Sequence, residues 1–208
     1  MTAARTRVKV CGIRSPEEGR AVARLGADAV GLVFHPGSSR FVSPEQAYEI
    51  SSRIPPFVAR VGIFVDEDPE TVAVLVHQVG LDAVQLHGSE PPAVCEVLSR
   101  ETRVIKAFRI REKSDLAGIE TYRVSAYLLD SRVEGLPGGT GRTFPWGVAV
   151  EAAGRFRPLI LSGGLNPENV GEAVRQVRPY AVDVSTGVES GGRKDLAKVE
   201  AFIKAVRG

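Results

Sequence analysis

The chain has 208 residues, of which 43% are hydrophobic and 25% are charged, and this composition is ordinary for a globular protein with one substantial core. Its 27 lysines and arginines against 25 aspartates and glutamates give a formal net charge of +2, and the basic residues are scattered along the chain. This distribution argues against a nucleic-acid-binding protein, so we expect a small molecule as the partner.

The sequence shows no sign of export or membrane insertion. The N-terminal stretch MTAARTRVKV lacks the apolar segment and cleavage site of a signal peptide, and no run of about 18 apolar residues occurs. The two cysteines, Cys11 and Cys95, make no disulfide framework and have no metal-ligand spacing, which fits a reducing compartment. We therefore predict a cytoplasmic protein without membrane contacts.

Eight short apolar segments recur along the chain, and segments of helical length separate them. The strand candidates are 7–13, 29–34, 59–65, 83–88, 103–110, 126–130, 158–164 and 181–187. This alternation, without a break in composition, predicts an α/β fold in which residues 1–208 form a single (β/α)8 TIM barrel, a catalytic domain. An open doubly wound sheet is the alternative.

Several intervening helices have clear predicted starts, because a capping residue is followed by proline. These pairs are Ser15 and Pro16, Ser43 and Pro44, Asp68 and Pro69, and Asn166 and Pro167. The segment 111–125 has little apolar periodicity and contains Gly118, so we expect the fifth helix to be short or irregular.

In such a barrel, active sites lie where the strands end and the next loops begin. Cys11 stands at the end of the first strand candidate, where a functional thiol and a packed core thiol are equally good interpretations. Cys95 lies in the middle of an amphipathic helix, so we expect it in the core.

Other strand ends carry polar groups. Strand periodicity places Gln85 and His87 on one face and Asp183 and Ser185 on another, and both faces would converge at the barrel mouth if they point inward. Asp130 follows the apolar run AYLL, where desolvation would raise its pKa and keep a proton available for donation. A capping or loop role for Asp130, and a structural role for His87, are the alternatives.

The strand period also places Lys9 on the same face as Cys11, hence inside the barrel. A buried ammonium needs a partner, and Asp183 belongs to the inward-facing series of the eighth strand, which closes beside the first. We therefore predict a Lys9–Asp183 pair, and we expect this cation to favour the thiolate of Cys11.

Three glycine-rich turns follow the last three strand candidates, at 136–141, 162–170 and 185–192. Glycines let backbone amides approach an anion closely, and the loops after strands seven and eight form the usual phosphate site of these barrels. The predicted phosphate-binding residues are Gly163, Gly164, Ser185, Thr186 and Gly187. Neither a Walker lysine motif nor an early GxGxxG is present, which argues against a nucleotide.

Taken together, these motifs resemble phosphoribosylanthranilate isomerase, a family of tryptophan biosynthesis, over residues 9–195. The matching stretches are KVCGI, FHPGSSRFVSPEQA, VGIFVD, VQLHG, LLD with GGTG, LSGGLNPENV and VDVSTGVESGGRKD. Two positions depart from the family pattern: Pro145 stands where aspartate is usual, and Thr186 where serine is usual, which keeps a hydroxyl.

The resemblance implies an Amadori rearrangement of N-(5-phosphoribosyl)anthranilate, with neither a metal nor an organic cofactor. By family position, Cys11 is the general base, Asp130 is the general acid and Arg40 pairs with the anthranilate carboxylate. We also expect Gln85, His87 and Asp183 to contact the substrate, although the roles of His87 and Asp183 stay open.

Two other functions stay open. A different sugar-phosphate isomerase or epimerase would keep the phosphate turns, but dual-specificity relatives have an aspartate where Cys11 stands. A non-catalytic phosphate-ligand-binding barrel would need neither the thiol nor the acid. The sequence is compatible with a monomer or a homodimer.

Overall fold

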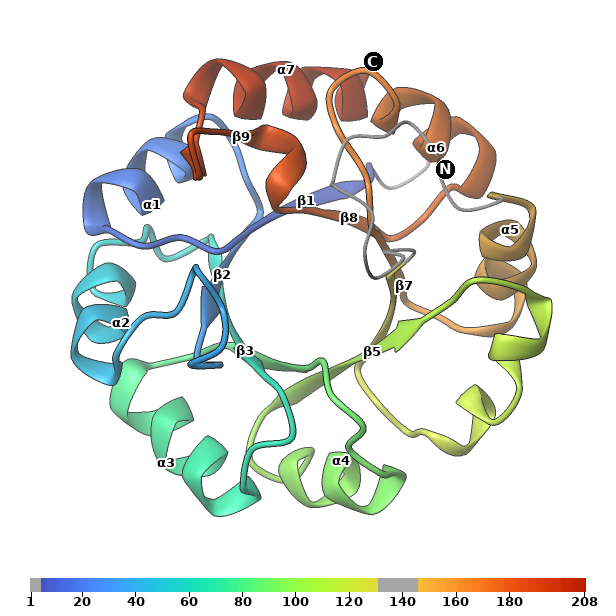
Figure 1. Ribbon diagram of the computed structural model, residues 1–208, viewed down its shortest axis with the longest axis horizontal. Helices are drawn as coiled ribbons and strands as arrows, with labels where there is room; N and C mark the ends of the chain where they lie inside the picture. The colour runs from blue at the N-terminus through green and yellow to red at the C-terminus, as the bar shows by residue number, and fades with distance from the viewer. Residues whose placement is uncertain (1–4, 131–145) are drawn as a thin grey trace.

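The computed structural model describes residues 5–130 and 146–208, and its centre is a closed barrel of eight parallel strands ringed by helices (Figure 1). The strands are Arg7–Cys11 (β1), Ala29–Val33 (β2), Ala59–Phe64 (β3), Ala83–Leu86 (β4), Arg103–Arg109 (β5), Ala126–Asp130 (β6), Leu159–Ser162 (β7) and Ala181–Val184 (β8). Each strand pairs with the next in the sequence, and β8 pairs with β1. The predicted barrel is therefore confirmed, and the open sheet is wrong.

The helices occupy the predicted intervals. They are Pro16–Arg24 (α1), Pro44–Ser51 (α2), Pro69–Val79 (α3), Pro92–Leu98 (α4), Trp146–Arg155 (α5), Val170–Val177 (α6) and Leu196–Arg207 (α7). Ser15, Ser43 and Asp68 cap α1, α2 and α3 as predicted, each accepting a hydrogen bond from a backbone amide of the first turn. Proline occupies the first helical position in all three.

The start predicted for α6 is wrong by three residues. Asn166 Oδ1 accepts hydrogen bonds from the amides of Glu168 and Asn169, but these close a separate turn that contains Pro167. The helix begins at Val170, and Asn169 is its N-cap residue without a side-chain capping hydrogen bond. The same Asx side chain that can start a helix can also close a turn, and the sequence pattern does not separate the two.

The fifth connection is irregular, as predicted. It contains two short 3-10 turns, Lys113–Leu116 (η1) and Ile119–Thr121 (η2), in place of an α-helix. Gly118 separates them with a φ of 80°, a left-handed conformation that favours glycine. The buried side chains of Leu116 and Ile119 hold this segment against the barrel.

Strand alternation divides the core into two layers. Val8 and Val10 of β1 point outward and pack in the large layer between barrel and helices, which also buries the Cys95 side chain as predicted. A smaller layer fills the barrel interior. It consists of Val61, Ala83, Ile105, Ala107, Ala126, Leu128, Ile160 and Ala181. Lys9 and Cys11 alternate with the two valines, so β1 presents them to the interior.

The predicted Lys9–Asp183 pair is present where the barrel closes. Lys9 stands opposite Asp183 in the β1–β8 register, and its Nζ lies 2.9 Å from Asp183 Oδ1. Both side chains are almost completely buried, at 4% and 6% exposed. Burial opposes the charged form of Lys9, but the charges of Asp183 and Cys11 outweigh it and raise the pKa of this lysine.

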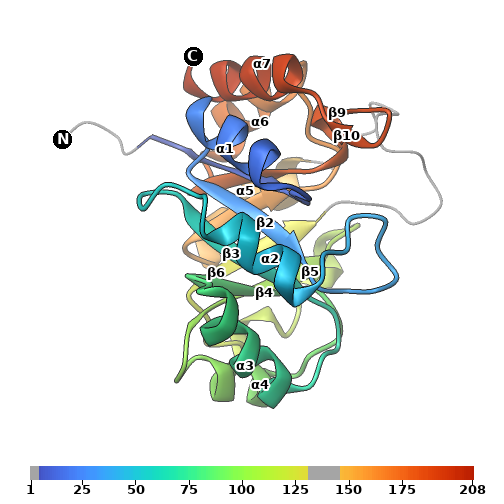
Figure 2. The ribbon, with the colours of Figure 1, turned by 90° about the vertical axis from the view of Figure 1, so that its left-hand side faces the viewer.

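A short hairpin follows β8, and the sequence analysis had not predicted it. After the 3-10 turn Thr186–Val188 (η3), strands Glu189–Ser190 (β9) and Arg193–Lys194 (β10) pair antiparallel. Figure 2 shows this hairpin and the loop between β2 and α2 projecting from the same end of the barrel. Residues 34–43 and 185–195 are therefore available to build one site.

Within residues 5–130 and 146–208, no helix combines the length and apolarity needed to cross a membrane.

The buried pair leads to a stability prediction. Lys9→Met leaves the Asp183 carboxylate buried without its partner, so we expect the free energy of unfolding to fall by about 3 to 5 kcal/mol. Lys9→Met combined with Asp183→Leu removes both charges and should recover much of that loss. Urea denaturation of the two variants measures both values, and additive losses in the double variant would contradict the pairing.

Candidate active site

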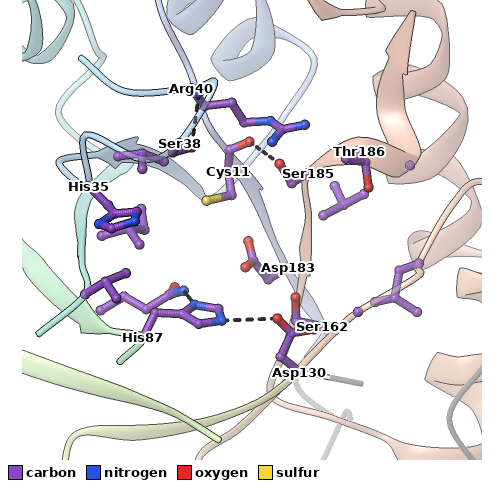
Figure 3. A pocket seen from close by; sticks show the side chains of 18 of the residues that line it. Cys11, His35, Ser38, Arg40, His87, Asp130, Ser162, Asp183, Ser185 and Thr186 are labelled. Carbon is purple, nitrogen blue, oxygen red and sulfur yellow. Dashed lines mark hydrogen bonds and ion pairs between the residues drawn. The ribbon is translucent and has the colours of Figure 1, made fainter. Parts of the chain in front are cut away.

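A cavity of about 600 Å3 opens at the carboxyl ends of the strands (Figure 3). Every site residue predicted from the sequence contributes to its lining. These residues are Cys11, Arg40, Gln85, His87, Asp130, Gly163, Gly164, Asp183, Ser185, Thr186 and Gly187. In the close-up view, Cys11 and Asp130 lie on opposite sides of the opening, with Asp183 between them.

The glycines around Cys11 explain the motif in which the thiol stands. Gly12 has a φ of 86°, and a Cβ there would collide with the Arg40 side chain. A Cβ on Gly31 of the neighbouring strand would lie only 2.8 Å from Cys11 Sγ. Glycine at both positions therefore leaves room for the thiol and for the arginine that crosses above it.

The groups around Cys11 only partly confirm the expectation that Lys9 favours its thiolate. Burial raises the pKa of the Cys11 thiol, and the charge of Asp183 acts in the same direction. Lys9 and Lys194 lower it, so a cation below the thiol does favour the thiolate as predicted, but burial is the larger effect. The two lysines therefore make ionisation of this buried thiol easier than burial alone would allow.

A hydrogen-bonded chain crosses the opposite side of the cavity. Gln85 Nε2 lies 2.9 Å from His87 Nδ1, and His87 Nε2 lies 3.1 Å from Asp130 Oδ2. His87 therefore links the Gln85 amide to the Asp130 carboxyl group and orients that group.

Arg40 reaches the cavity from the loop between β2 and α2. Figure 3 shows its side chain crossing above Cys11 towards the loop that carries Ser185 and Thr186. Its guanidinium forms a bidentate pair with Glu189, with Nε 2.7 Å and Nη2 2.6 Å from the two carboxylate oxygens. A positive group thus stands at the rim, already fixed by a protein carboxylate.

Two of the three predicted glycine turns lie together. Gly163 and Gly164 follow β7 with φ values of 86° and 64°. A Cβ on Gly187 would collide with the carbonyl oxygen of Leu165, so only glycine lets the loop after β8 lie this close to the loop after β7. Ser185 ties the same corner to β1 through a hydrogen bond to the Cys11 carbonyl oxygen. The third turn, at 136–141, and Pro145 lie outside the described residues.

Sequence reasoning missed several residues of this end of the barrel. His35, Arg109 and Arg111 also line the cavity, and Glu189 and Lys194 form an ion pair behind Arg40. The arginines stand at the end of β5 and just after it, so the strand-end rule could have found them. Glu189 and Lys194 lie in the family-like stretch VDVSTGVESGGRKD, but no periodicity marks them, because their positions depend on how the loop after β8 folds back.

The fold and this cavity define a (β/α)8 barrel whose mouth carries a thiol, a carboxyl group, an arginine and two glycine turns, and this mouth is where the active sites of barrel enzymes lie. The family model described as N-(5'-phosphoribosyl)anthranilate (PRA) isomerase matches residues 8–205. The chain belongs to this family.

Proteins of this family are similar in sequence and structure to almost the whole chain. The N-(5'-phosphoribosyl)anthranilate isomerase of Geobacter sulfurreducens is 53% identical, covering 97% of this chain and 98% of its own. The crystal structure of the Thermotoga maritima phosphoribosyl anthranilate isomerase superposes with a TM-score of 0.93 at 47% identity, covering 98% of this chain and 99% of its own. A related structure contains reduced 1-(o-carboxyphenylamino)-1-deoxyribulose 5-phosphate, with a TM-score of 0.89, 46% identity and coverage of 98% and 99%.

The electrostatics of Cys11 can be tested by alkylation. Because Lys9 lowers the pKa of this thiol, Lys9→Met should move the midpoint of the iodoacetamide rate against pH to a higher value. Lys204→Met, which removes an exposed lysine, is the matched control and should leave the midpoint unchanged. Cys95 adds little background, because it is fully buried and its pKa is raised to about 11. An unchanged midpoint in Lys9→Met would show that Lys9 does not act on the thiol.

Proposed function

We propose that this protein catalyses the isomerisation of N-(5'-phosphoribosyl)anthranilate to 1-(2-carboxyphenylamino)-1-deoxyribulose 5-phosphate, a step of tryptophan biosynthesis. The observation that carries the proposal is the placement of Cys11 and Asp130 on opposite sides of one cavity that also contains two glycine turns and an arginine. Family membership supports the same reaction.

The reaction needs an acid and then a base. Asp130 donates its proton to the furanose ring oxygen as the bond from that oxygen to C1' breaks, which gives an open-chain Schiff base. Cys11, as the thiolate, takes the proton from C2', and the electron pair of that C–H bond moves to form an enolamine. The Cys11 thiol then gives a proton to C1' while the Asp130 carboxylate takes the proton of the C2' hydroxyl, which gives the ketone and restores both groups. Substrate and product are isomers, so no proton is gained or lost overall.

His87 supports the acid, because its Nε2 hydrogen bond fixes the direction of the Asp130 carboxyl. Lys9 and Lys194 support the base, because they stabilise the thiolate that burial disfavours. Asp183 pairs with Lys9 and limits the charge beneath the sugar. These residues prepare the two proton-transfer groups before the substrate arrives.

The two ends of the substrate provide its anchors. We assign its phosphate to the turns of Gly163, Gly164, Ser185, Thr186 and Gly187, where backbone amides can surround an anion. We assign the anthranilate carboxylate to Arg40, whose planar guanidinium suits a carboxylate. The sugar then lies between Cys11 and Asp130.

Two alternative functions are tested by the turnover assay described below. A different sugar-phosphate isomerase or epimerase is disfavoured by Cys11, and a barrel that only binds ligand has no use for a paired acid and base. Residues 1–208 as one catalytic domain, and a cytoplasmic location, stay predictions of this proposal.

The Thermotoga maritima relative is described as dimeric, and a structure of monomers generated from it is known.

The proposal predicts the effect of removing either proton-transfer group. Cys11→Ala and Asp130→Asn should each lower kcat by at least about a hundredfold, followed as the loss of substrate fluorescence. Cys95→Ala and Asp82→Asn make the same substitutions away from the cavity and should keep most of the turnover. Near-normal turnover in Cys11→Ala or Asp130→Asn would remove that residue from the mechanism, and an inactive wild-type protein would refute the function itself.

A further inference from the structure

Glu189 holds two cations beside the cavity without lining it. Its Oε1 lies 2.7 Å from Arg40 Nε and 2.6 Å from Lys194 Nζ, and its Oε2 lies 2.6 Å from Arg40 Nη2. Lys194 Nζ also donates to the carbonyl oxygen of Ser185 at 3.2 Å. One carboxylate therefore links the loop before α2, the hairpin after β8 and the proposed phosphate turn.

The group is buried enough for these contacts to fix its geometry. The side chains of Arg40, Glu189 and Lys194 are 19%, 9% and 1% exposed. Burial alone would raise the pKa of Glu189, but Arg40 and Lys194 outweigh it and lower the pKa to about 2, so Glu189 is ionised at neutral pH. Two cations and one anion leave a net charge of +1 at the rim, which suits one more anion.

The guanidinium of Arg40 still has a free side. Glu189 uses Nε and one hydrogen of Nη2, and no residue in the described parts of the chain receives a hydrogen bond from Nη1. Two hydrogens on Nη1 and one on Nη2 remain, and these form the end of the guanidinium fork, where a second carboxylate can bind bidentately. Binding Glu189 and binding a ligand carboxylate are therefore compatible.

The rest of the Arg40 side chain is also fixed. Its aliphatic part lies over Gly12, where any Cβ would collide with it, and its backbone amide donates to Ser38 Oγ at 3.1 Å. Together with Glu189, these contacts restrain both the aliphatic part and the guanidinium of a side chain that otherwise has many rotamers.

We propose that Glu189 is a positioning residue that orients Arg40 so that the free end of its guanidinium receives the aromatic carboxylate of the ligand. The inference rests on the proposed function, because it takes Arg40 as the carboxylate-binding residue. In the opposite arrangement, Glu189 would occupy the place of that carboxylate and would compete with the ligand. Removing the Glu189 charge would weaken ligand binding if Glu189 positions Arg40, and would strengthen it if Glu189 competes with the ligand.

The experiment compares wild type with Glu189→Gln and Glu189→Asp. Two ligands are titrated: reduced 1-(o-carboxyphenylamino)-1-deoxyribulose 5-phosphate and its phenylamino counterpart, which lacks the carboxyl group. Glu189→Gln should weaken binding of the first and raise KM by about tenfold, the size of one charge-assisted hydrogen bond, with little change in kcat or in binding of the second. Glu189→Asp keeps the charge between the two cations, so it should fold normally and give a smaller loss.

Two further variants separate positioning from general damage. Asp82→Asn breaks a similar bidentate pair with Arg60 at the opposite end of the barrel and should change neither KM nor binding. Arg40→Ala should weaken binding of the carboxylate ligand, and adding Glu189→Gln to it should cause no further loss, because the two residues act through one contact.

The outcomes also separate this inference from the proposed function. Tighter binding in Glu189→Gln, equal weakening of both ligands, or no change would overturn the positioning role. A wild-type protein that binds the carboxylate ligand but does not turn over the substrate would refute the function and leave the binding test of Glu189 intact.

Discussion

The buried pair of Lys9 and Asp183 is the constraint on which the site depends. It lies where β8 meets β1, so the two charges can meet only if the barrel closes in this register. A shift of β1 by one residue would turn Lys9 and Cys11 away from the interior, would bring apolar side chains such as Val10 into it and would leave Asp183 without its partner. The same register that neutralises the pair therefore places the Cys11 thiol at the mouth.

The closure of the barrel also determines which charges lie near Cys11. Cys11 is buried enough for the thiol to resist ionisation, and Lys9 from below and Lys194 from the side oppose that effect. On the opposite wall, Gln85 and His87 form a hydrogen-bonded chain that ends on the Asp130 carboxyl group. The two lysines act on the proposed base, and the histidine orients the proposed acid on the other side of the cavity.

The sequence predicted those features that depend on a short-range period. Alternation along strands placed Lys9, Cys11 and Asp183 inside, and Ser-Pro and Asp-Pro pairs located the first three helices. Asn166 misled because its side chain can close a turn as readily as a helix start. Glu189 and Lys194 could not be found, since they belong to an irregular hairpin without a period. The direction of the Cys11 pKa shift depends on the balance between burial, which raises the pKa, and the two lysines, which lower it. The sequence does not show how deeply the thiol is buried, so it could not predict this direction.

The central claim is that the ligand lies between the thiol and the carboxyl group, with its two anions at the turns and at Arg40. A crystal structure of the protein with reduced 1-(o-carboxyphenylamino)-1-deoxyribulose 5-phosphate tests it most directly. The account predicts phosphate against Gly164 and Gly187, the ring carboxylate on the free end of Arg40, and Cys11 Sγ within roughly 3 to 3.5 Å of C2' or its hydrogen. A ligand whose phosphate binds elsewhere, or whose sugar lies away from both Cys11 and Asp130, would contradict it.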